Sequence, residues 1–372
     1  MQSELVTASG IILFGALMCA LLILVNASAI GSYLQIMDHP DANRKRHVQV
    51  TPLVGGPAII LPVILWSTAT LLWSHGADPR LELAILLCGS GATLVGFADD
   101  QSSTSPSSRL LSLCLLTSIA LIVDPDLLPH QLNWGSFAPL PLAPWFAFGF
   151  VVIAMTGYVN AVNMADGQNG IVTGMYAIWA LCLTLVTGGV TQSAALVLLE
   201  TSLVVFTFNM AGRVFLGDSG TYGVTFVFGL LVIRAHNHWG VSPETITVWF
   251  FIPVLDCIRL IVTRLLQGKP PSNGDRDHLH HRLEDRVGKS YGLMIYLGVV
   301  GGSSLVSSLY PHLALLCMIG LAAFYFSFAW LAAAESAEQD AEAGDVVPLQ
   351  VRRMENSNVV VLETKEHSTD RP

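Results

Sequence analysis

Residues 145–186 read WFAFGFVVIAMTGYVNAVNMADGQNGIVTGMYAIWALCLTLV, two apolar runs on either side of the polar stretch NAVNMADGQNG at 160–170. Each apolar run approaches the length that a helix needs to cross a bilayer, about 20 residues. The chain as a whole repeats this pattern. Of its 372 residues 52% are hydrophobic and only 12% are charged, whereas about a quarter of a soluble protein is charged. The composition therefore predicts a polytopic membrane protein.

The predicted fold is all-α, because a chain in lipid must satisfy its backbone hydrogen bonds within helices. We count about eleven transmembrane helices when each is taken to need about 20 apolar residues. They fall at residues 10–34, 53–74, 81–98, 110–123, 145–162, 171–188, 191–208, 219–235, 243–266, 291–309 and 311–334. The fourth of these is the shortest. Residues 1–334 form the predicted transmembrane catalytic domain.

The distribution of Lys and Arg predicts the orientation of these helices, since basic loops stay in the cytoplasm. Loops after odd-numbered helices carry most of the cations, and loops after even-numbered helices carry little beyond Arg80 and Arg234. The N-terminus is then outside and the C-terminus cytoplasmic. The tail, residues 335–372, is polar and is expected to be a disordered cytoplasmic segment, with a short strand at 359–362.

The stretch at 160–170 is the first candidate site. Asn160, Asn163 and Asp166 are spaced three residues apart, so on a helix they share one face. Gly167 and Gly170 permit a tight turn that ends the helix. A plain polar loop would explain the glycines but not the spacing of the amides and the carboxylate. Such groups at the end of a membrane helix are costly unless they bind something.

Two further clusters lie on the predicted cytoplasmic side. Arg44, Lys45, Arg46 and His47 form a compact cationic group, which serves as the positive-inside signal or attracts a phosphate. Three histidines follow in DHLHHRL, His278, His280 and His281, together with Arg282. Their spacing lacks the cysteines and intervals of familiar zinc sites, and imidazole beside arginine suits an anionic diphosphate better.

Carboxylates end or begin three of the predicted helices. Asp99 and Asp100 are adjacent, so they need a cation, a shared proton or full solvation; they could support phosphate chemistry or simply end a solvated helix. Asp218 is flanked by Gly217 and Gly220. It could ligate Mg²⁺, which prefers one or two carboxylates plus substrate phosphates, or Asp218 or Ser219 could cap the following helix.

The remaining intramembrane charges divide into a predicted pair and two isolated groups. Asp256 and Arg259 are one helical turn apart and are expected to pair, whereas Glu200 and Arg234 have no evident partner in the sequence. Carboxylates and cations gathered at one membrane face suit a metal-assisted phosphoryl transfer. A site bordering lipid suits a lipid co-substrate.

Taken together, these clusters resemble the polyprenyl-phosphate N-acetylhexosamine-1-phosphate transferase family, in its bacterial GlcNAc branch. The resemblance covers about residues 30–290 and rests on five ordered motifs. They are RKRH…PLVGG (44–56), the pair at 99–100, NAVNMADG (160–167), FLGDSGT (215–221) and DHLHHRL (277–283). The family's eleven spans and outside N-terminus agree with the count made above.

The resemblance implies a reaction at the bacterial inner membrane, with the active site facing the cytoplasm. Undecaprenyl phosphate attacks the β-phosphate of a UDP-N-acetylhexosamine, most simply UDP-GlcNAc, and UMP leaves. This is the first membrane step of cell-surface polysaccharide synthesis, such as O antigen. The resemblance also allows a homodimer, and nothing in the sequence predicts a nucleic-acid partner.

The resemblance likewise implies roles for individual residues. Asp218 would ligate Mg²⁺ or Mn²⁺, while Asp99 and Asp100 would position or deprotonate the lipid phosphate. The catalytic set would also include Asn163 and Asp166. Substrate would be bound by Arg44, Lys45, Arg46, His47, Asn160, Asn169, His278, His280, His281 and Arg282.

Two departures from the family pattern concern substrate binding. Asn169 stands where many bacterial relatives have a second Asp, and Ser107 stands near a position where Lys is common, although Arg109 remains. His-Leu-His-His resembles the GlcNAc branch rather than the branch that uses UDP-MurNAc-pentapeptide.

Several alternatives stay open at this stage. The donor sugar could be GlcNAc, GalNAc, QuiNAc or FucNAc. A transporter would place its polar residues near the bilayer midplane, whereas these crowd one face. A structural scaffold would not need clusters of Asp, Asn and His at helix ends.

Overall fold

The computed structural model describes residues 2–40, 49–73, 78–134, 138–270, 277–328, 350–353 and 360–363. The chain divides into two compact units, Met1–Ala323 and Phe324–Pro372. Arg44, Lys45, Arg46 and His47 lie outside the described residues, so their predicted role in binding phosphate stays a prediction. The second unit contains the antiparallel strands β5 (Gln350–Arg353) and β6 (Val360–Glu363), and β6 overlaps the strand expected at 359–362.

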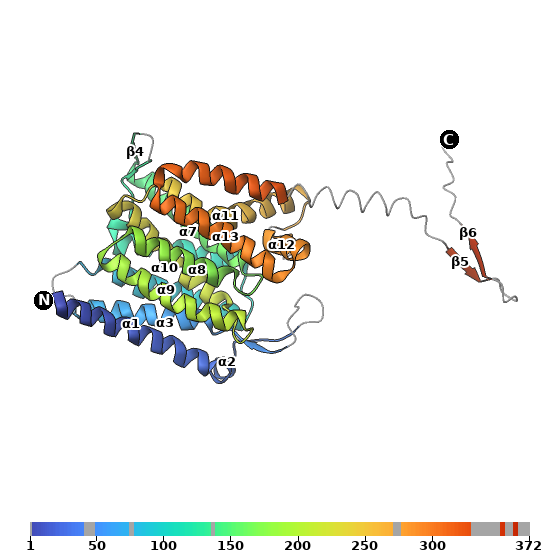
Figure 1. The fold of residues 1–372 in the computed structure, drawn as a ribbon, viewed down its shortest axis with the longest axis horizontal. Helices are drawn as coiled ribbons and strands as arrows, with labels where there is room; N and C mark the ends of the chain where they lie inside the picture. Colours follow the sequence, from blue (N-terminus) through green and yellow to red (C-terminus); the bar gives the residue numbers. More distant parts are fainter. Residues whose placement is uncertain are drawn as a thin grey trace. The chain divides into compact units, whose positions relative to one another are not determined.

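The first unit is a bundle of helices (Figure 1). Its labelled helices are α1 (Gln2–Val25), α2 (Ala27–Leu34), α3 (Gly55–Trp73), α4 (Arg80–Ala84), the π-helical η1 (Ile85–Gly89), α5 (Ser90–Gln101), α6 (Pro106–Val123), η2 (Pro125–Leu127), α7 (Pro144–Ala165), α8 (Ile171–Val186), α9 (Gly189–Met210), α10 (Gly217–Trp239), α11 (Pro243–Leu266), α12 (Leu279–Val287), α13 (Lys289–Leu309) and η3 (Pro311–Leu313). Helical structure continues after η3 over residues 314–328.

The all-α polytopic fold is confirmed. Among the described residues, eight helices are long and apolar enough to cross a membrane, or nine if α1 and α2, which bend by 73°, count as one span. The short fourth span predicted at 110–123 is among them, as Pro106–Val123. The other two predicted spans coincide with α8, which has 16 residues, and with α10. The total of eleven spans and the orientation of the termini stay predictions.

Helix α10 differs from the others because protein surrounds it. It packs against α3, α5, α7 and α8, and Figure 1 shows it in the middle of the bundle. Its central residues, such as Val224, Phe226 and Phe228, are fully buried. A helix enclosed by other helices does not need a lipid-facing apolar surface, so it can carry the small and polar residues of FLGDSGT at its start.

The close packing around the start of α10 depends on glycines. A Cβ on Gly56 of α3 would lie 2.3 Å from the Gly220 Cα, and a Cβ on Gly96 of α5 would lie 2.1 Å from the Asp218 carbonyl oxygen. Neither position tolerates a side chain. These contacts bring PLVGG and the end of α5 against the first turn of α10, and so join three of the five motifs.

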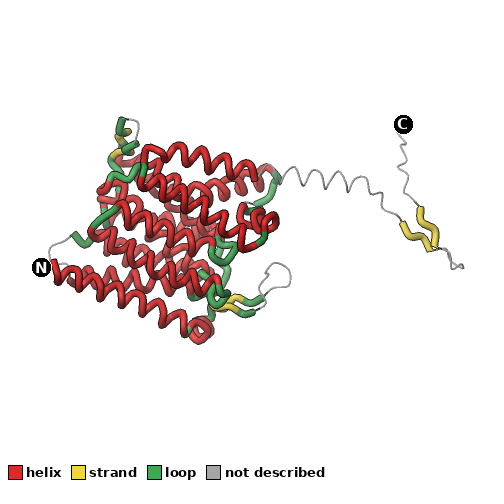
Figure 2. The backbone as a smooth tube through the Cα atoms, in the orientation of Figure 1, coloured by secondary structure: helices red, strands yellow, loops and turns green. Residues whose placement is uncertain are grey.

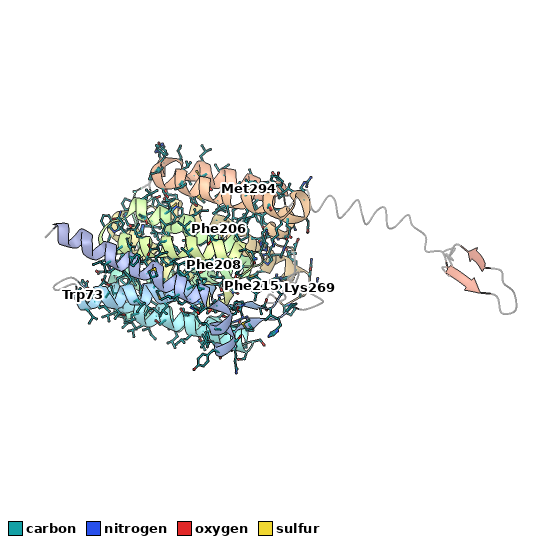
Figure 3. All side chains as sticks on the ribbon, turned by 60° about the horizontal axis from the view of Figure 1, so that its bottom comes forward. Trp73, Phe206, Phe208, Phe215, Lys269 and Met294 are labelled. Atoms are coloured by element: carbon teal, nitrogen blue, oxygen red, sulfur yellow. The ribbon has the colours of Figure 1, made fainter. Side chains whose placement is uncertain are left out.

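The loops with polar motifs gather at one end of the bundle. Figure 2 shows the small hairpin of β1 (Met37–Asp38) and β2 (Thr51–Pro52) at that end, and the hairpin of β3 (Gln131–Leu132) and β4 (Leu140–Pro141) at the other. In Figure 3, Phe215 and Lys269 lie toward the end opposite Trp73. The helices alternate in direction, so the ends of α5 and α7, the start of α10 and the whole of α12 meet there.

Candidate active site

The centre of the site is the contact between the end of α5 and the start of α10. The Asp218 backbone N–H donates to Asp100 Oδ1 over 2.7 Å, and the Ser219 N–H donates to Asp100 Oδ2 over 2.9 Å. Gly217 has φ +74°, and a Cβ there would lie 2.9 Å from Asp100 Oδ2. Asp100 thus caps α10 from a neighbouring helix, with both carboxylate oxygens occupied.

This arrangement argues against the alternative that Asp218 or Ser219 caps the helix. The residue at the N-cap position is Leu216, which has no side chain able to accept a hydrogen bond. The carboxylate of Asp100 supplies the missing acceptor and also carries the negative charge that a helix N-terminus favours. Asp218 is therefore free of the capping role, which leaves its carboxylate for other contacts.

Asp99 faces a different set of partners. Its Oδ1 accepts hydrogen bonds from the Thr104 N–H (2.6 Å) and the Thr104 hydroxyl (2.7 Å). Its Oδ2 forms an ion pair with the Arg109 guanidinium. The side chain of Asp99 is only 6% exposed, so the repulsion expected between the two adjacent carboxylates is relieved by a cation on one and by a helix N-terminus on the other.

Asp218 connects α10 to α7 and α6. Its Oδ1 accepts a hydrogen bond from the Asn163 amide over 2.8 Å, and the same amide nitrogen donates to the Thr221 hydroxyl over 2.8 Å. Its Oδ2 lies 3.9 Å from Arg109 Nη1. Asp218 is 32% exposed, so its carboxylate is held in place while part of it stays accessible to a ligand.

The loop after α7 holds the other predicted residues of that motif. Asp166 lies one residue beyond the helix and is exposed. Asn169 is half-buried in the same loop. Asn160 lies within α7, and its amide donates to the Thr156 carbonyl on its own helix over 2.8 Å. The helical face predicted for three residues therefore contains Asn160 and Asn163, with Asp166 just past its end.

The Asp166 carboxyl combines surface accessibility with a dense protein environment. Loss of solvation among the surrounding protein atoms, together with a smaller effect of the nearby Asp100 carboxylate, raises the pKa of Asp166 to about 7. The accessible surface shows that the group is not enclosed. A ligand can therefore reach the Asp166 carboxyl from solvent.

Asn209 is a buried residue that sequence reasoning missed. Its Oδ1 accepts a hydrogen bond from the Gly170 N–H over 2.7 Å, and its Nδ2 donates to the Val214 carbonyl over 2.9 Å. It ties the loop after α7 to the loop before α10. No pattern in the sequence distinguishes this asparagine from others in the apolar run around it.

The three histidines lie beside the loop after α7. The His280 and His281 ring centroids are 4.2 Å apart, and those of His278 and His280 are 5.3 Å apart in a stacked arrangement. A Cβ on Gly167 would lie 2.4 Å from His280 Nε2 and 3.3 Å from His281 Nε2. The structure therefore brings DHLHHRL and NMADG into direct contact, although 110 or more residues separate them in the chain.

Arg282 and the intramembrane charges have identifiable partners. Arg282 Nε donates to Asp277 Oδ1 over 3.0 Å. The predicted pair of Asp256 and Arg259 is confirmed at 3.2 Å. Arg234 pairs with the fully buried Asp124 at 3.1 Å, at the opposite end of the bundle. Glu200 lies half-buried in α9, away from the motifs.

The donor groups fit a magnesium ion better than zinc. No group of three or more His, Cys, Asp or Glu side chains arranged for metal binding occurs in the part of the chain that the structure describes. Mg²⁺ does not require one, because it keeps waters and takes phosphate oxygens from its substrate. Asp218, partly exposed and hydrogen-bonded through one oxygen, and the accessible Asp166 are the carboxylates that fit such an ion.

Comparison with known proteins gives one family. The family model described as "Glycosyl transferase family 4" matches residues 83–236, which contain Asp99, Asp100, Asp166 and Asp218. The undecaprenyl-phosphate alpha-N-acetylglucosaminyl 1-phosphate transferase of Yersinia pestis is 29% identical over 270 residues, covering 68% of this chain and 71% of that protein.

Two other relatives give similar alignments. The protein of the same name from Salmonella typhi is 26% identical over 276 residues, with 68% and 71% coverage. A probable undecaprenyl-phosphate N-acetylglucosaminyl 1-phosphate transferase of Bacillus subtilis is 24% identical over 280 residues, with 72% and 75% coverage. These matches confirm the resemblance drawn from the five motifs. The chain is therefore similar to glycosyl transferase family 4 over residues 83–236.

Proposed function

We propose that the chain transfers GlcNAc-1-phosphate from UDP-GlcNAc to undecaprenyl phosphate and releases UMP. The names of the relatives supply the donor sugar and the lipid acceptor. The observation that carries the proposal is the convergence on Asp218: Asn163 donates to its carboxylate, Arg109 lies beside it and Asp100 fixes its backbone. Four helices thereby hold one partly exposed carboxylate at the end of a membrane bundle.

The proposed reaction is a displacement at phosphorus. An oxygen of the lipid phosphate attacks the β-phosphorus of UDP-GlcNAc, the bond from that phosphorus to the bridging oxygen breaks, and UMP leaves with the bridging oxygen. Such a transfer depends on positioning and charge stabilisation more than on covalent chemistry by the protein. A phosphate already ionised at pH 7 needs no strong base, so Asp99, already paired with Arg109, serves to position that guanidinium.

The proposed cofactor is Mg²⁺, with Mn²⁺ as a substitute, bound by Asp218 and Asp166. When bound it neutralises diphosphate oxygens, which allows one anion to approach another. Asn163 holds the Asp218 carboxylate in place. Arg109, 3.9 Å from Asp218, can stabilise charge on the same phosphates. The histidines and Arg282 are the proposed contacts for the diphosphate and sugar.

The proposed setting is the bacterial inner membrane, with the site at its cytoplasmic face. The excess of Lys and Arg in the loops at the site end supports this orientation. The clustering of polar groups at one end also argues against a transporter, which would place them near the midplane.

The test is turnover by the purified full-length protein with undecaprenyl phosphate, Mg²⁺ and a panel of UDP-N-acetyl sugars. We expect UMP and a lipid-linked product with UDP-GlcNAc. Turnover with only UDP-GalNAc or only a UDP-6-deoxy sugar would support the proposed reaction but with a different donor sugar. No turnover with any donor, combined with UDP-sugar uptake by vesicles, would support the transporter instead.

A further inference from the structure

Asp256, a carboxylate in the second half of α11, contacts one of the site histidines. It is 5% exposed, and its Oδ2 lies 2.8 Å from His278 Nδ1. The same oxygen accepts the Leu279 N–H over 3.3 Å. A single buried carboxylate thus holds both the ring of His278 and the backbone at the first residue of α12.

The contact with Asp256 determines which nitrogen of His278 remains for other partners. A carboxylate only accepts hydrogen bonds when it is ionised, so Nδ1 must carry a proton to bond to it. The second nitrogen, Nε2, is then left for a substrate group. A histidine ligand oriented by a carboxylate on its other nitrogen is a recurrent device in metal sites, where the carboxylate fixes both tautomer and ring orientation.

The influence of Asp256 extends from His278 toward the centre of the site. The His278 ring stacks on His280 at 5.3 Å with an interplanar angle of 21°. His280 Nε2 in turn lies against Gly167, which follows Asp166. A continuous line of contacts therefore runs from Asp256 through two imidazole rings to the loop that carries Asp166.

The negative charge of Asp256 is compensated by an arginine next to its other oxygen. Arg259 Nη2 lies 3.2 Å from Asp256 Oδ1, and Arg259 Nη1 lies 2.8 Å from Asp277 Oδ2. Arg282 also binds Asp277. A buried carboxylate with a guanidinium partner can remain charged, and the chain of ion pairs ties α11 to the start of α12.

We propose that Asp256 is a positioning residue for the reaction: it orients His278 so that Nε2 meets the diphosphate of the nucleotide sugar. The proposal rests on the function proposed above. Asp256 itself touches no substrate, and its effect passes through the His278 ring. It follows that removing the charge of Asp256 should lower activity only while His278 is present.

The experiment is a double-mutant cycle with Asp256→Asn, His278→Ala and the two combined. We expect Asp256→Asn to lower kcat/KM for UDP-GlcNAc on the order of 10-fold, the lower end of effects seen for groups that orient histidine ligands. The KM for undecaprenyl phosphate should stay unchanged. In the His278→Ala background, Asp256→Asn should cause no further loss, because residues acting as a unit are not additive.

Asp126→Asn is the matched control, because Asp126 is a carboxylate at the opposite end of the bundle that is 41% exposed and lies 3.8 Å from Arg80. It should leave kcat/KM within about twofold of wild type, since an interaction at that distance contributes little. Asp256→Glu, which keeps the charge, should recover part of the activity that Asp256→Asn loses.

Two further measurements distinguish a failure of this proposal from a failure of the proposed function. The thermal unfolding midpoint of each variant shows whether Asp256 only stabilises the fold. The affinity of each variant for UDP-GlcNAc, measured by calorimetry, tests the same cycle without requiring turnover. Additive losses, an unaffected Asp256→Asn protein, or an Asp256→Asn protein that no longer folds would each overturn the proposal. An inactive wild type would overturn the proposed function, while the affinity cycle would still test the role of Asp256.

Discussion

Adjacent carboxylates can have different tasks when their partners differ. Asp100 accepts two backbone N–H groups from α10, whereas Asp99 pairs with Arg109 and Thr104. The two side chains leave α5 in different directions, since successive helical residues are about 100° apart. Asp100 therefore organises the backbone around Asp218, and Asp99 fixes the nearby cation. Both oxygens of each carboxylate are engaged by protein groups.

Asp218→Ala should abolish metal-dependent turnover, because it removes the carboxylate that the other motifs hold. We expect a loss of at least about 100-fold in kcat, the size seen when one charge-stabilising group is removed from an active site. The measurement is UMP release against Mg²⁺ concentration, with thermal unfolding as a check on folding. Asp126→Asn, at an exposed carboxylate on the opposite end of the bundle, is the control. Normal activity in Asp218→Ala would exclude Asp218 as a ligand.

The raised pKa of Asp166 predicts a pH-dependent requirement for Mg²⁺. With its pKa at about 7, the carboxyl is protonated below pH 7, and a cation must then displace the proton. The Mg²⁺ concentration giving half-maximal activity should therefore rise as the pH falls from about 8 to about 6. Asp166→Asn should weaken Mg²⁺ binding at high pH and flatten this dependence. An unchanged pH dependence in Asp166→Asn would assign the titration to another group.

At the level of elements, the start of α10 depends on an acceptor supplied by α5. Helix starts leave N–H groups without partners, and here the carboxylate of Asp100 takes two of them. Stability and site geometry are consequently linked, since the same two hydrogen bonds fix the backbone that carries Asp218.

Asp100→Ala should destabilise the protein as well as inactivate it. Loss of a helix cap costs about 0.5–2 kcal/mol, and here two buried N–H groups lose their acceptor. We expect a lower midpoint of thermal unfolding together with reduced turnover. Asp100→Asn should fall between Asp100→Ala and wild type, since its amide oxygen still accepts one hydrogen bond. Full stability in Asp100→Ala would contradict the assignment of Asp100 as the cap of α10.

The contact between helix α12 and the loop after α7 leads to a second prediction at the level of secondary-structure elements. In Gly167→Ala the new Cβ would lie 2.4 Å from His280 Nε2, so the histidines must shift away from Asp166. We expect a loss of about 10-fold or more in kcat/KM for UDP-GlcNAc, because small displacements of binding groups are costly. Gly157→Ala, within α7 and with no atom inside 4 Å of its Cβ, should stay near wild type. Equal activity in the two variants would contradict a close approach of His280 to Gly167.

At the scale of the molecule, the sequence predicted the helices well because hydropathy is a local signal. Within the described residues, each of the eleven predicted spans overlaps a helix, and α10, which does not pass as a candidate span by length and composition, is enclosed by other helices. The five motifs were found for the same reason, since each is a short run of residues. The Asp256–Arg259 pair was also predictable, being one helical turn apart.

The partners of the site residues could not be read from the sequence, because they depend on how distant helices pack. Asp100 and the Asp218 backbone are 118 residues apart, and the Asn163 amide and Asp218 are 55 apart. The alternative that Asp218 or Ser219 caps α10 was wrong for this reason, because it considered only residues of α10 itself and not an acceptor from α5. The role of Asn209 was hidden likewise, since its two backbone partners belong to different loops.

The central claim is that the bundle moves a phosphate together with its sugar, and the nucleotide released tests this most directly. Purified protein, undecaprenyl phosphate, Mg²⁺ and UDP-GlcNAc labelled in both the β-phosphate and the sugar should release UMP and carry both labels into lipid in equal amounts. Release of UDP, with only the sugar label in lipid, would show transfer of the sugar alone and contradict the account.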